Sequence, residues 1–341
     1  MPGRELDISV VICCYNSSGR LAPTIKHLAE QEFNSEIKWE VVIVDNASTD
    51  DTNEYALNEL SKYQFESKVV YESEAGLSNA RKKGVKESSG RYILFCDDDN
   101  WLDKRYFQLS YDIMESDPKI GMLGGFGEPY IEGLKPKWFD RYQVTYAVGP
   151  QHHEEADISY IKAYVYGAGS VVRKELLLLL DKIGFKHVLT DRIGKKMVSG
   201  GDNEIGYAMV LLGYKVYYSP RLKFEHYIPQ GRLTKEYLLK IYIAQVLTTP
   251  VVKAYEQFIF DKTLRYWQIG VQNAIIDAKK IIKLNLKWLK KEVDDLDHYL
   301  RIRRLAAQIK YSLLNKGLHA SNFQKVKRNI ELIQRFVSNA D

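Results

Sequence analysis

The fold of this chain is decided by the stretch Tyr92-Ile93-Leu94-Phe95-Cys96-Asp97-Asp98-Asp99. Its first five residues form a short apolar run typical of a buried strand, and the run ends in three consecutive carboxylates. Adjacent carboxylates repel one another, so a partly buried strand end tolerates them only where their charge is compensated. A hard divalent cation such as Mg²⁺ or Mn²⁺ takes oxygen ligands and keeps positions open for substrate phosphates. The alternative is a solvated acidic turn, but ligands of open α/β sheets bind outside the carboxyl ends of strands, where this triplet would lie.

Strands and helices alternate through the N-terminal part of the chain. Three other apolar runs of strand type precede the acidic triplet, and each is followed by a turn cluster and a helical pattern. Alternation at this spacing predicts βαβ units and a mostly parallel sheet. The predicted strands are residues 8–14, 39–44, 68–71 and 91–96, and the predicted helices begin near Leu21, Ser48 and Gly76.

The rest of the chain is irregular in its middle and helical at its end. Residues 124–160 hold several glycines and three prolines, and so long an irregular stretch inside a compact domain is typical of a functional loop. The later predictions are a strand at 164–172, helices at 173–183 and 200–212, a strand at 215–218, and long helices from 233 onward with a break at Pro250.

The composition is that of a soluble globular protein, with 45% hydrophobic and 27% charged residues among 341. The three cysteines have no metal-type spacing and fit core thiols in a reducing compartment. The N-terminus has no apolar signal region, and the uncharged stretch 241–252 is shorter than the ~20 residues of a membrane-spanning helix. We therefore expect a cytoplasmic protein, with any membrane contact peripheral and on the inner face.

The net charge of +5 is divided unevenly along the chain. Residues 231–341 carry 21 Lys and Arg against 10 Asp and Glu, a balance of +11, so residues 1–230 carry 28 against 34, a balance of −6. A basic tail on an acidic body suggests that the tail meets an anionic partner, such as a membrane surface or a phosphate-bearing acceptor. A nucleic-acid partner is not expected, because the body is acidic and no recognisable binding module is present.

Several motifs occur in a fixed order. Cys14-Tyr15-Asn16 ends the first strand and Val44-Asp45-Asn46-Ala47-Ser48-Thr49-Asp50 ends the second. Gly76-Leu77-Ser78-Asn79-Ala80-Arg81 precedes the acidic strand end, and Gly201-Asp202-Asn203-Glu204 opens a later helix, ahead of His226. In this order the motifs resemble the family 2 glycosyltransferases, which have the GT-A fold.

The resemblance extends over residues 7–228 and implies a Rossmann-like α/β fold. Its sheet would be mixed but mostly parallel, flanked by helices and followed by a C-terminal helical extension. We expect residues 1–230 to form the nucleotide-sugar-binding and catalytic domain, and residues 231–341 a basic, mainly helical region. The chain departs from the family where Cys13-Cys14 replaces a Pro-Thr type of pair and where Gly201 stands in place of a frequent Glu.

The resemblance also implies a donor site. Asp99 would ligate Mn²⁺ or Mg²⁺, and Asp97 would contact the ribose or the metal, with Asp98 sharing either role. Asp45 resembles the family's uracil-binding aspartate. His226 matches a late histidine that completes the metal shell in several GT-A enzymes, although a lone histidine can equally be structural. The remaining expected donor contacts are Tyr15 and Asn16 at the base, and Arg81, whose fixed positive charge suits phosphate but also a surface helix.

Asp202 is the expected general base, with Glu204 beside it. It would take the proton from an acceptor hydroxyl in a single displacement with inversion. An acidic residue at a helix start is also ordinary capping chemistry, so Glu204 would either position the acceptor or cap the helix.

Trp138 and His152 are the candidates for acceptor contacts. Trp138 could stack on a sugar ring, although a buried core aromatic is the more frequent case. We expect His152 and His153 to point to opposite sides of an extended segment and so not to form a metal pair.

These observations predict a metal-dependent inverting glycosyltransferase of surface polysaccharide synthesis. The donor would be a nucleotide-diphosphate sugar, with UDP favoured, and the acceptor a saccharide or a lipid-linked glycan. Apolar faces of the tail could also support a homodimer. The alternatives are a sugar-phosphate nucleotidyltransferase, which would carry a more basic, glycine-rich loop after the first strand, and a catalytically silent binding or assembly subunit.

Overall fold

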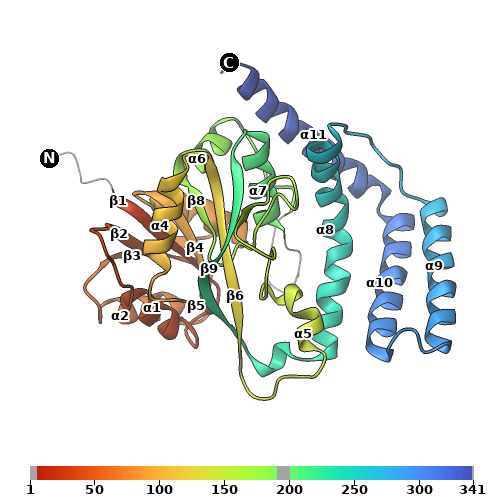
Figure 1. Cartoon of the computed structure of the whole chain (residues 1–341), viewed down its shortest axis with the longest axis horizontal. Coiled ribbons are helices and arrows are strands. Elements are labelled where there is room, and N and C mark those ends of the chain that lie inside the picture. The colour runs from red at the N-terminus through yellow and green to blue at the C-terminus, as the bar shows by residue number, and fades with distance from the viewer. Residues whose placement is uncertain (1–5, 190–199, 340–341) are drawn as a thin grey trace.

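The computed structural model describes residues 6–189 and 200–339. A mixed nine-stranded sheet lies at its centre, with helices on both faces and a group of long helices at one end (Figure 1). Its strands are β1 (Leu6–Cys14), β2 (Trp39–Asn46), β3 (Glu66–Glu72), β4 (Gly90–Asp97), β5 (Asn100–Leu102), β6 (Ile120–Ile131), β7 (Ala156–Asp157), β8 (Val171–Arg173) and β9 (Lys215–Ile228). Their order is β3-β2-β1-β4-β8-β6-β9-β5, with β7 paired to β9.

Helices connect the strands and then form the C-terminal region. The helices are α1 (Leu21–Ala29), α2 (Thr52–Leu60), α3 (Leu77–Glu87), α4 (Tyr106–Ser116), α5 (Phe139–Tyr142), α6 (Lys174–Lys182), α7 (Gly201–Leu211), α8 (Lys235–Asp261), α9 (Val271–Leu289), α10 (Asp295–Leu314) and α11 (Lys316–Ser338), with short 3₁₀ helices η1 (Gln143–Tyr146) and η2 (Gln230–Arg232).

The first four strands form a parallel sheet, as the alternating pattern predicts. β1 lies between β2 and β4, and β2 pairs with β3. Alternate residues of each strand face opposite sides of the sheet. Val11 belongs to one hydrophobic core with α3, α6 and α7, whereas Val10 and Ile12 belong to a second core with α1 and α4. Both faces are covered, which explains why β1, β2 and β4 are largely apolar rather than alternating, whereas the edge strand β3 is more exposed.

The second part of the sheet is mixed, because β8 runs antiparallel to both β4 and β6 while β6 and β9 run parallel. The predicted irregular region is wrong in its first part, since β6 continues to Ile131. Glycines interrupt the apolar pattern of this strand in the sequence, and they are needed because neighbouring atoms leave no room for a side chain. A Cβ on Gly124 would lie 2.3 Å from the Cβ of Val165, and a Cβ on Gly125 would lie 2.2 Å from the carbonyl oxygen of Leu222.

The strand predicted at 164–172 is also mostly wrong, because only Val171–Arg173 pair in the sheet. Ala163 and Gly169 have φ angles of 61° and 69°, and such left-handed residues interrupt an extended strand. The strand predicted at 215–218 exists but continues to Ile228. This extension matters for the site, because it carries His226.

The C-terminal helices extend one of the two cores. α8 and α11 contribute Tyr255, Ile330 and Ile333 to the same buried cluster as Tyr207 of α7. The helix break predicted at Pro250 is wrong, since α8 continues through it. Pro250 has no N–H to donate to the Val246 carbonyl four residues earlier, so the helix lacks one backbone hydrogen bond there. The neighbouring Thr249 hydroxyl donates to the Gln245 carbonyl at 2.6 Å. No helix among the described residues is long and apolar enough to span a membrane.

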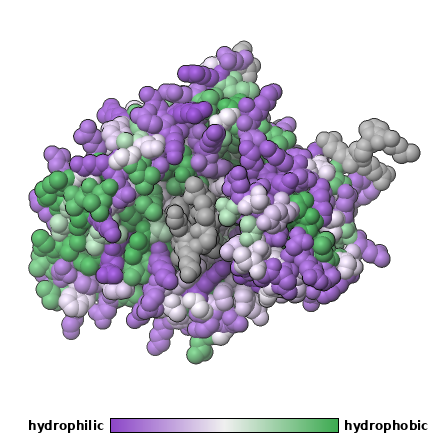
Figure 2. Space-filling model, turned by 180° about the vertical axis from the view of Figure 1, so that it is seen from behind, coloured by the Kyte–Doolittle hydropathy of each residue, from purple (hydrophilic) through white to green (hydrophobic). Residues whose placement is uncertain are grey.

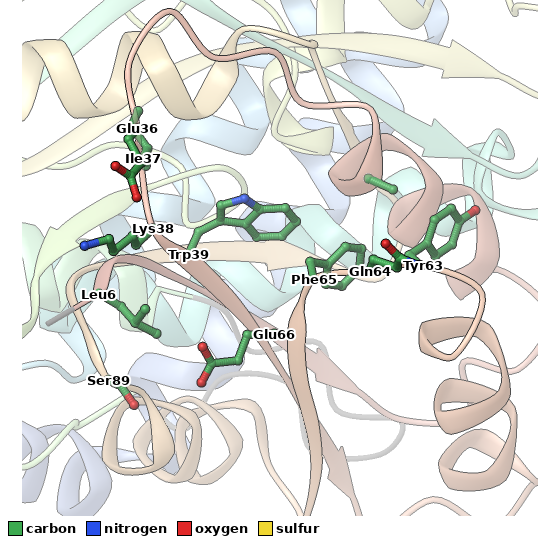
Figure 3. A pocket seen from close by; sticks show the side chains of 11 residues that line it. Leu6, Glu36, Ile37, Lys38, Trp39, Tyr63, Gln64, Phe65, Glu66 and Ser89 are labelled. Atoms are coloured by element: carbon green, nitrogen blue, oxygen red, sulfur yellow. The ribbon is translucent and has the colours of Figure 1, made fainter. Parts of the chain in front are cut away.

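A hollow of about 1080 Å³ lies at the amino ends of the parallel strands (Figure 3). Leu6, Trp39 and Phe65 line it from the starts of β1 and β2 and from the residue before β3, and the rings of Trp39 and Phe65 are 4.8 Å apart. Ligands of such sheets bind at the opposite, carboxyl ends of the strands. The functional site is therefore sought at the other edge.

Close packing of α3 on the sheet gives a first prediction. A Cβ on Gly84 would lie 2.4 Å from Cγ1 of Val11 and 3.2 Å from Cγ2 of Val44. We expect Gly84→Ala to lower the free energy of unfolding by about 1–3 kcal/mol through overpacking, measured by urea denaturation. Gly317→Ala is the matched control, because Gly317 is also helical and has no atom within 4 Å of the added Cβ. Equal effects of the two substitutions would contradict the packing argument.

Candidate functional site

Strand register places the sequence motifs at one edge of the sheet. Cys14 of β1 lies opposite Asp45 of β2, and Cys13 lies opposite Asp97 of β4. Asp45 and Asp97 therefore flank the end of β1, where Tyr15 follows. Parallel strands end at the same edge, so this arrangement follows from the register of three strands.

The carboxylate of Asp98 is buried and engaged by the start of α1. The Ser17 hydroxyl donates to it, and Arg20 Nε donates at 2.9 Å. The Thr24 hydroxyl also donates to the Asp98 carbonyl at 2.9 Å. Burial raises the pKa of Asp98, as does neighbouring Asp99, and Arg20 opposes both effects. These contacts fix the triplet against the loop after β1.

Asp99 faces the C-terminal end of β9 and the 3₁₀ helix η2. Its Oδ2 accepts from Arg232 Nη1 at 3.0 Å, and its Oδ1 lies 3.6 Å from Nε2 of His226. Burial by itself would raise the pKa of Asp99, but His226 and then Arg232 outweigh it and hold that pKa well below the usual range. β5 explains the proximity, because it pairs Asn100 directly with His226.

Asp99 and His226 are donors of the kind that Mn²⁺ and Mg²⁺ accept. An oxygen and a nitrogen 3.6 Å apart are spaced as two ligands of one cation can be, given metal–ligand bonds of about 2.1 Å. Nδ1 of His226 is buried and has no hydrogen-bond partner among the described residues. Within residues 6–189 and 200–339, no three His, Cys, Asp or Glu side chains are grouped to hold a metal. Asp97 stays a predicted contact of the ribose or the metal. A cation here would complete its shell with substrate phosphate and water.

The residues predicted to contact the base lie in the loop after β1 and at the end of β2. Asn16 joins this loop to the one after β2: its amide oxygen accepts from the Thr49 N–H at 2.8 Å, and its own N–H donates to the Ser48 hydroxyl at 3.1 Å. Its φ of 51° is a conformation that asparagine tolerates well. Asp45 is buried and accepts from the Ser48 N–H at 3.1 Å, whereas Tyr15 is 46% exposed. An exposed ring next to a buried carboxylate is suited to a planar base.

Arg81 and Asp202 meet over Gly167. A Cβ on Gly167 would lie 2.6 Å from Nη2 of Arg81 and 3.2 Å from Cβ of Asp202, so only glycine leaves room for both. Asp202, at the start of α7, accepts from the Gly167 N–H at 2.8 Å and from the Asn203 N–H at 3.0 Å. The Arg81 guanidinium also lies 5.2 Å from the centre of the Phe95 ring, on the strand that carries the triplet. The structure thus brings together residues that are 121 positions apart in the chain.

Glu204 is placed differently from Asp202. Its carboxylate is fully buried and accepts from the backbone N–H groups of Val188 and Leu189 at 2.9 and 2.8 Å, and from the Tyr255 hydroxyl at 3.2 Å. These contacts join α7 to residues 188–189 and to α8. Glu204 therefore holds a buried segment of backbone against α7 and α8.

The two acceptor candidates lie in separate surroundings. Trp138 packs in an aromatic cluster with Phe139 and Tyr142, with ring centres 6.4 and 6.3 Å away. The expectation that His152 and His153 point apart is wrong, since their ring centres are 3.9 Å apart. The reason is that the chain bends there and is not extended.

A comparison with known protein families shows which family the chain belongs to. The sequence profile described as "Glycosyl transferase family 2" matches residues 9–179, half of the chain. The chain belongs to this family. Its match covers β1 to α6 and hence Asp45, Arg81 and the acidic triplet.

Relatives of this family 2 protein include glycosyltransferase GlyA of Streptococcus pneumoniae, 24% identical over 67% of this chain and 31% of that protein. Poly-beta-1,6-N-acetyl-D-glucosamine synthase of Staphylococcus aureus is 27% identical over 35% of this chain and 28% of that protein. The chain thus matches less than a third of the length of these two relatives. The mannosyltransferase PcManGT of Pyrobaculum calidifontis, solved with GDP-Man and Mn²⁺, has a TM-score of 0.58 at 16% identity, covering 92% of this chain and 89% of that one. This likeness confirms the GT-A fold.

Three basic residues of the site were not among the predicted site residues. Arg20 and Arg232 pair with Asp98 and Asp99, and Lys162 lies near Asp202. The turn after β1 could have indicated Arg20, since it follows the first strand end directly. Nothing in the local sequence indicates Arg232 or Lys162, because their partners are far away in the chain.

Lys162 is largely enclosed by aromatic rings. Its Nζ lies 4.4 Å from the ring centre of Tyr164 and 4.7 Å from that of Tyr166, and it donates to the Gln151 amide oxygen at 3.4 Å. Burial lowers the pKa of Lys162 to about 8, although Asp202 raises it in part.

This pKa predicts a pH dependence of stability. Below pH 8 Lys162 is charged in both the folded and the unfolded state, so the full cost of burying its charge lowers the free energy of unfolding. Between pH 8 and 10.5 the folded lysine is neutral while the unfolded one still binds a proton, so stability rises with pH. We expect wild type to gain roughly 3 kcal/mol relative to Lys162→Met across this interval, measured by urea unfolding. Exposed Lys26→Met is the control, and parallel curves for wild type and Lys162→Met would contradict the prediction.

Proposed function

We propose that this protein transfers a glycosyl group from a nucleotide-diphosphate sugar to an acceptor hydroxyl, with inversion at the anomeric carbon. What supports the proposal is the placement of Asp45 and Asp97 at neighbouring strand ends, of Asp99 beside His226, and of Arg81 beside Asp202. Membership of glycosyl transferase family 2 supports it, as does the name of its pneumococcal relative.

The donor would bind with its base between Tyr15 and Asp45, where the buried carboxylate accepts a hydrogen bond from the base. We propose uracil as that base. Asn16 holds the two flanking loops in place, Asp97 would bind the ribose, and Asp98 would keep the strand end fixed through Arg20. Arg81 would lie against the diphosphate as a fixed positive charge.

Asp99 and His226 would hold Mn²⁺ or Mg²⁺, which supplies charge neutralisation and orientation to the leaving diphosphate when bound. The solved mannosyltransferase with the same fold contains Mn²⁺, which supports this choice. Arg232 neutralises Asp99 in the absence of a cation.

Asp202 would act as the general base. The backbone N–H groups of Gly167 and Asn203 donate to its carboxylate and orient it. The acceptor oxygen forms a bond to the anomeric carbon on the face opposite the diphosphate, and its proton passes to Asp202. The bond from that carbon to the diphosphate oxygen breaks, and its electron pair leaves with the nucleotide. Glu204 would support this geometry by holding residues 188–189 to α7.

We further propose a saccharide or lipid-linked acceptor in surface polysaccharide synthesis, at the inner face of the cytoplasmic membrane. Residues 1–230 would form the catalytic unit, and Trp138 and His152 remain its acceptor candidates. The basic residues 231–341 would provide peripheral membrane contact or a homodimer contact. Their net charge of +11 supports the membrane contact, because it attracts anionic lipids.

Nucleotide binding tests the donor site. Calorimetry with UDP, GDP and dTDP, with and without Mn²⁺, should show manganese-dependent binding of UDP that Asp99→Ala abolishes. Asp261→Ala, an exposed carboxylate at the end of α8, is the matched control and should bind like wild type. If none of the nucleotides binds under either condition, the donor site is wrong and a silent binding subunit becomes the better interpretation.

A second experiment separates the two acidic residues of α7. Asp202→Asn keeps the shape but removes the base, so we expect release of UDP from UDP-sugars to slow by about 10²–10⁴-fold with unchanged UDP affinity. Glu204→Gln should mainly lower the unfolding midpoint, because Glu204 contacts backbone and Tyr255. The reverse result, a rate loss confined to a well-folded Glu204→Gln, would assign the base to Glu204.

A further inference from the structure

Helix α9 has a continuous apolar strip that faces solvent. Val271, Ile275, Ile282, Leu286 and Leu289 are 60%, 49%, 62%, 54% and 69% exposed. With exposed Ala278 they recur every three or four residues, so they lie on one side of the helix. We refer to these six residues as the α9 strip.

A row of lysines runs alongside this strip. Lys279, Lys283, Lys287 and Lys290 are all exposed, and each follows a residue of the strip by one position. One residue corresponds to about 100° around a helix, so the lysine row lies parallel to the strip and beside it. A third row, which includes Ala274, Asp277 and Leu284, is buried and packs towards α10.

The position of α9 leaves this side accessible. Figure 1 shows α9 at the edge of the molecule, beyond α8 and α10 and far from the strands β1 to β4. Figure 2, seen from behind, shows hydrophobic side chains gathered at the corresponding edge, with hydrophilic ones next to them. The helix is straight enough in Figure 1 to contact a flat surface along its length.

We propose that α9 binds flat on an anionic phospholipid bilayer, with the α9 strip among the outer acyl segments and the lysine row at the headgroups. An apolar strip beside lysines is the pattern of helices that lie in the membrane interface. An antiparallel pairing of two copies through the strip would bring the two lysine rows to the same side, where like charges repel, whereas anionic lipids attract them. The inference deepens the membrane position proposed above, yet it does not depend on glycosyl transfer.

Vesicle co-sedimentation of the full chain tests the proposal. We expect binding to vesicles of phosphatidylcholine mixed with phosphatidylglycerol, weakened by salt, and little binding to phosphatidylcholine alone. Lys279→Gln combined with Lys283→Gln should weaken binding roughly thirtyfold, given the contribution of each lysine near such a surface. Ile282→Asp combined with Leu286→Asp should weaken it at least tenfold.

The control is Leu57→Asp, which changes a leucine of similar exposure (52%) on α2 at the opposite side of the molecule. It should bind vesicles like wild type. Equal binding to both kinds of vesicle, or unchanged binding of the α9 variants, would overturn the proposal. A wild-type dimer in sedimentation velocity that Ile282→Asp with Leu286→Asp dissociates would also overturn it, in favour of a second copy.

Thermal unfolding and UDP binding of each variant separate the two proposals. The unfolding temperature and the UDP affinity should both match wild type, because α9 lies at the edge of the molecule beyond α8 and α10 (Figure 1). Vesicle binding by a protein that binds no nucleotide would leave this inference standing while the proposed function fails.

Discussion

The site depends on the parallel pairing of β1 between β2 and β4. That register brings Cys14 opposite Asp45 and Cys13 opposite Asp97, so three loops leave the sheet at the same level. A slip of one residue would turn every side chain of β1 to the other face. It would place Val10 and Ile12 in the core that now contains Val11. Such a slip would disrupt the packing of both cores and is therefore unfavourable. Packing on two faces therefore fixes the positions of the polar residues at the edge.

The acidic triplet at this edge is compensated by the protein itself. Arg20 pairs with Asp98 and Arg232 with Asp99, one from the start of α1 and the other from the 3₁₀ helix before α8. Each guanidinium lets a buried carboxylate keep its charge, which would otherwise be costly. Arg232 thus couples the donor side of the site to the beginning of the C-terminal helices.

Some of the C-terminal helices pack into the core of the fold, whereas another is largely exposed to solvent. α8 and α11 share a core with α7, and Tyr255 of α8 donates to the buried Glu204 next to Asp202. α9 contributes no residue to that core and instead exposes a regular apolar strip. The same basic region therefore supports the site through its inner helices and presents a separate surface through its outer one.

The sequence by itself determined the alternating elements, the four parallel strands and the motifs at their ends, because local apolar periodicity and strand-end chemistry are written in adjacent residues. It also pointed to the family. It missed β6 and the extension of β9, since their glycines and polar residues suit neighbours that only packing supplies. It could not pair Asp99 with Arg232 or place Arg81 beside Asp202, because hydrogen bonds between distant segments leave no local pattern. Tertiary structure alone decided which carboxylates are neutralised by arginines and which, like Glu204, hold the backbone.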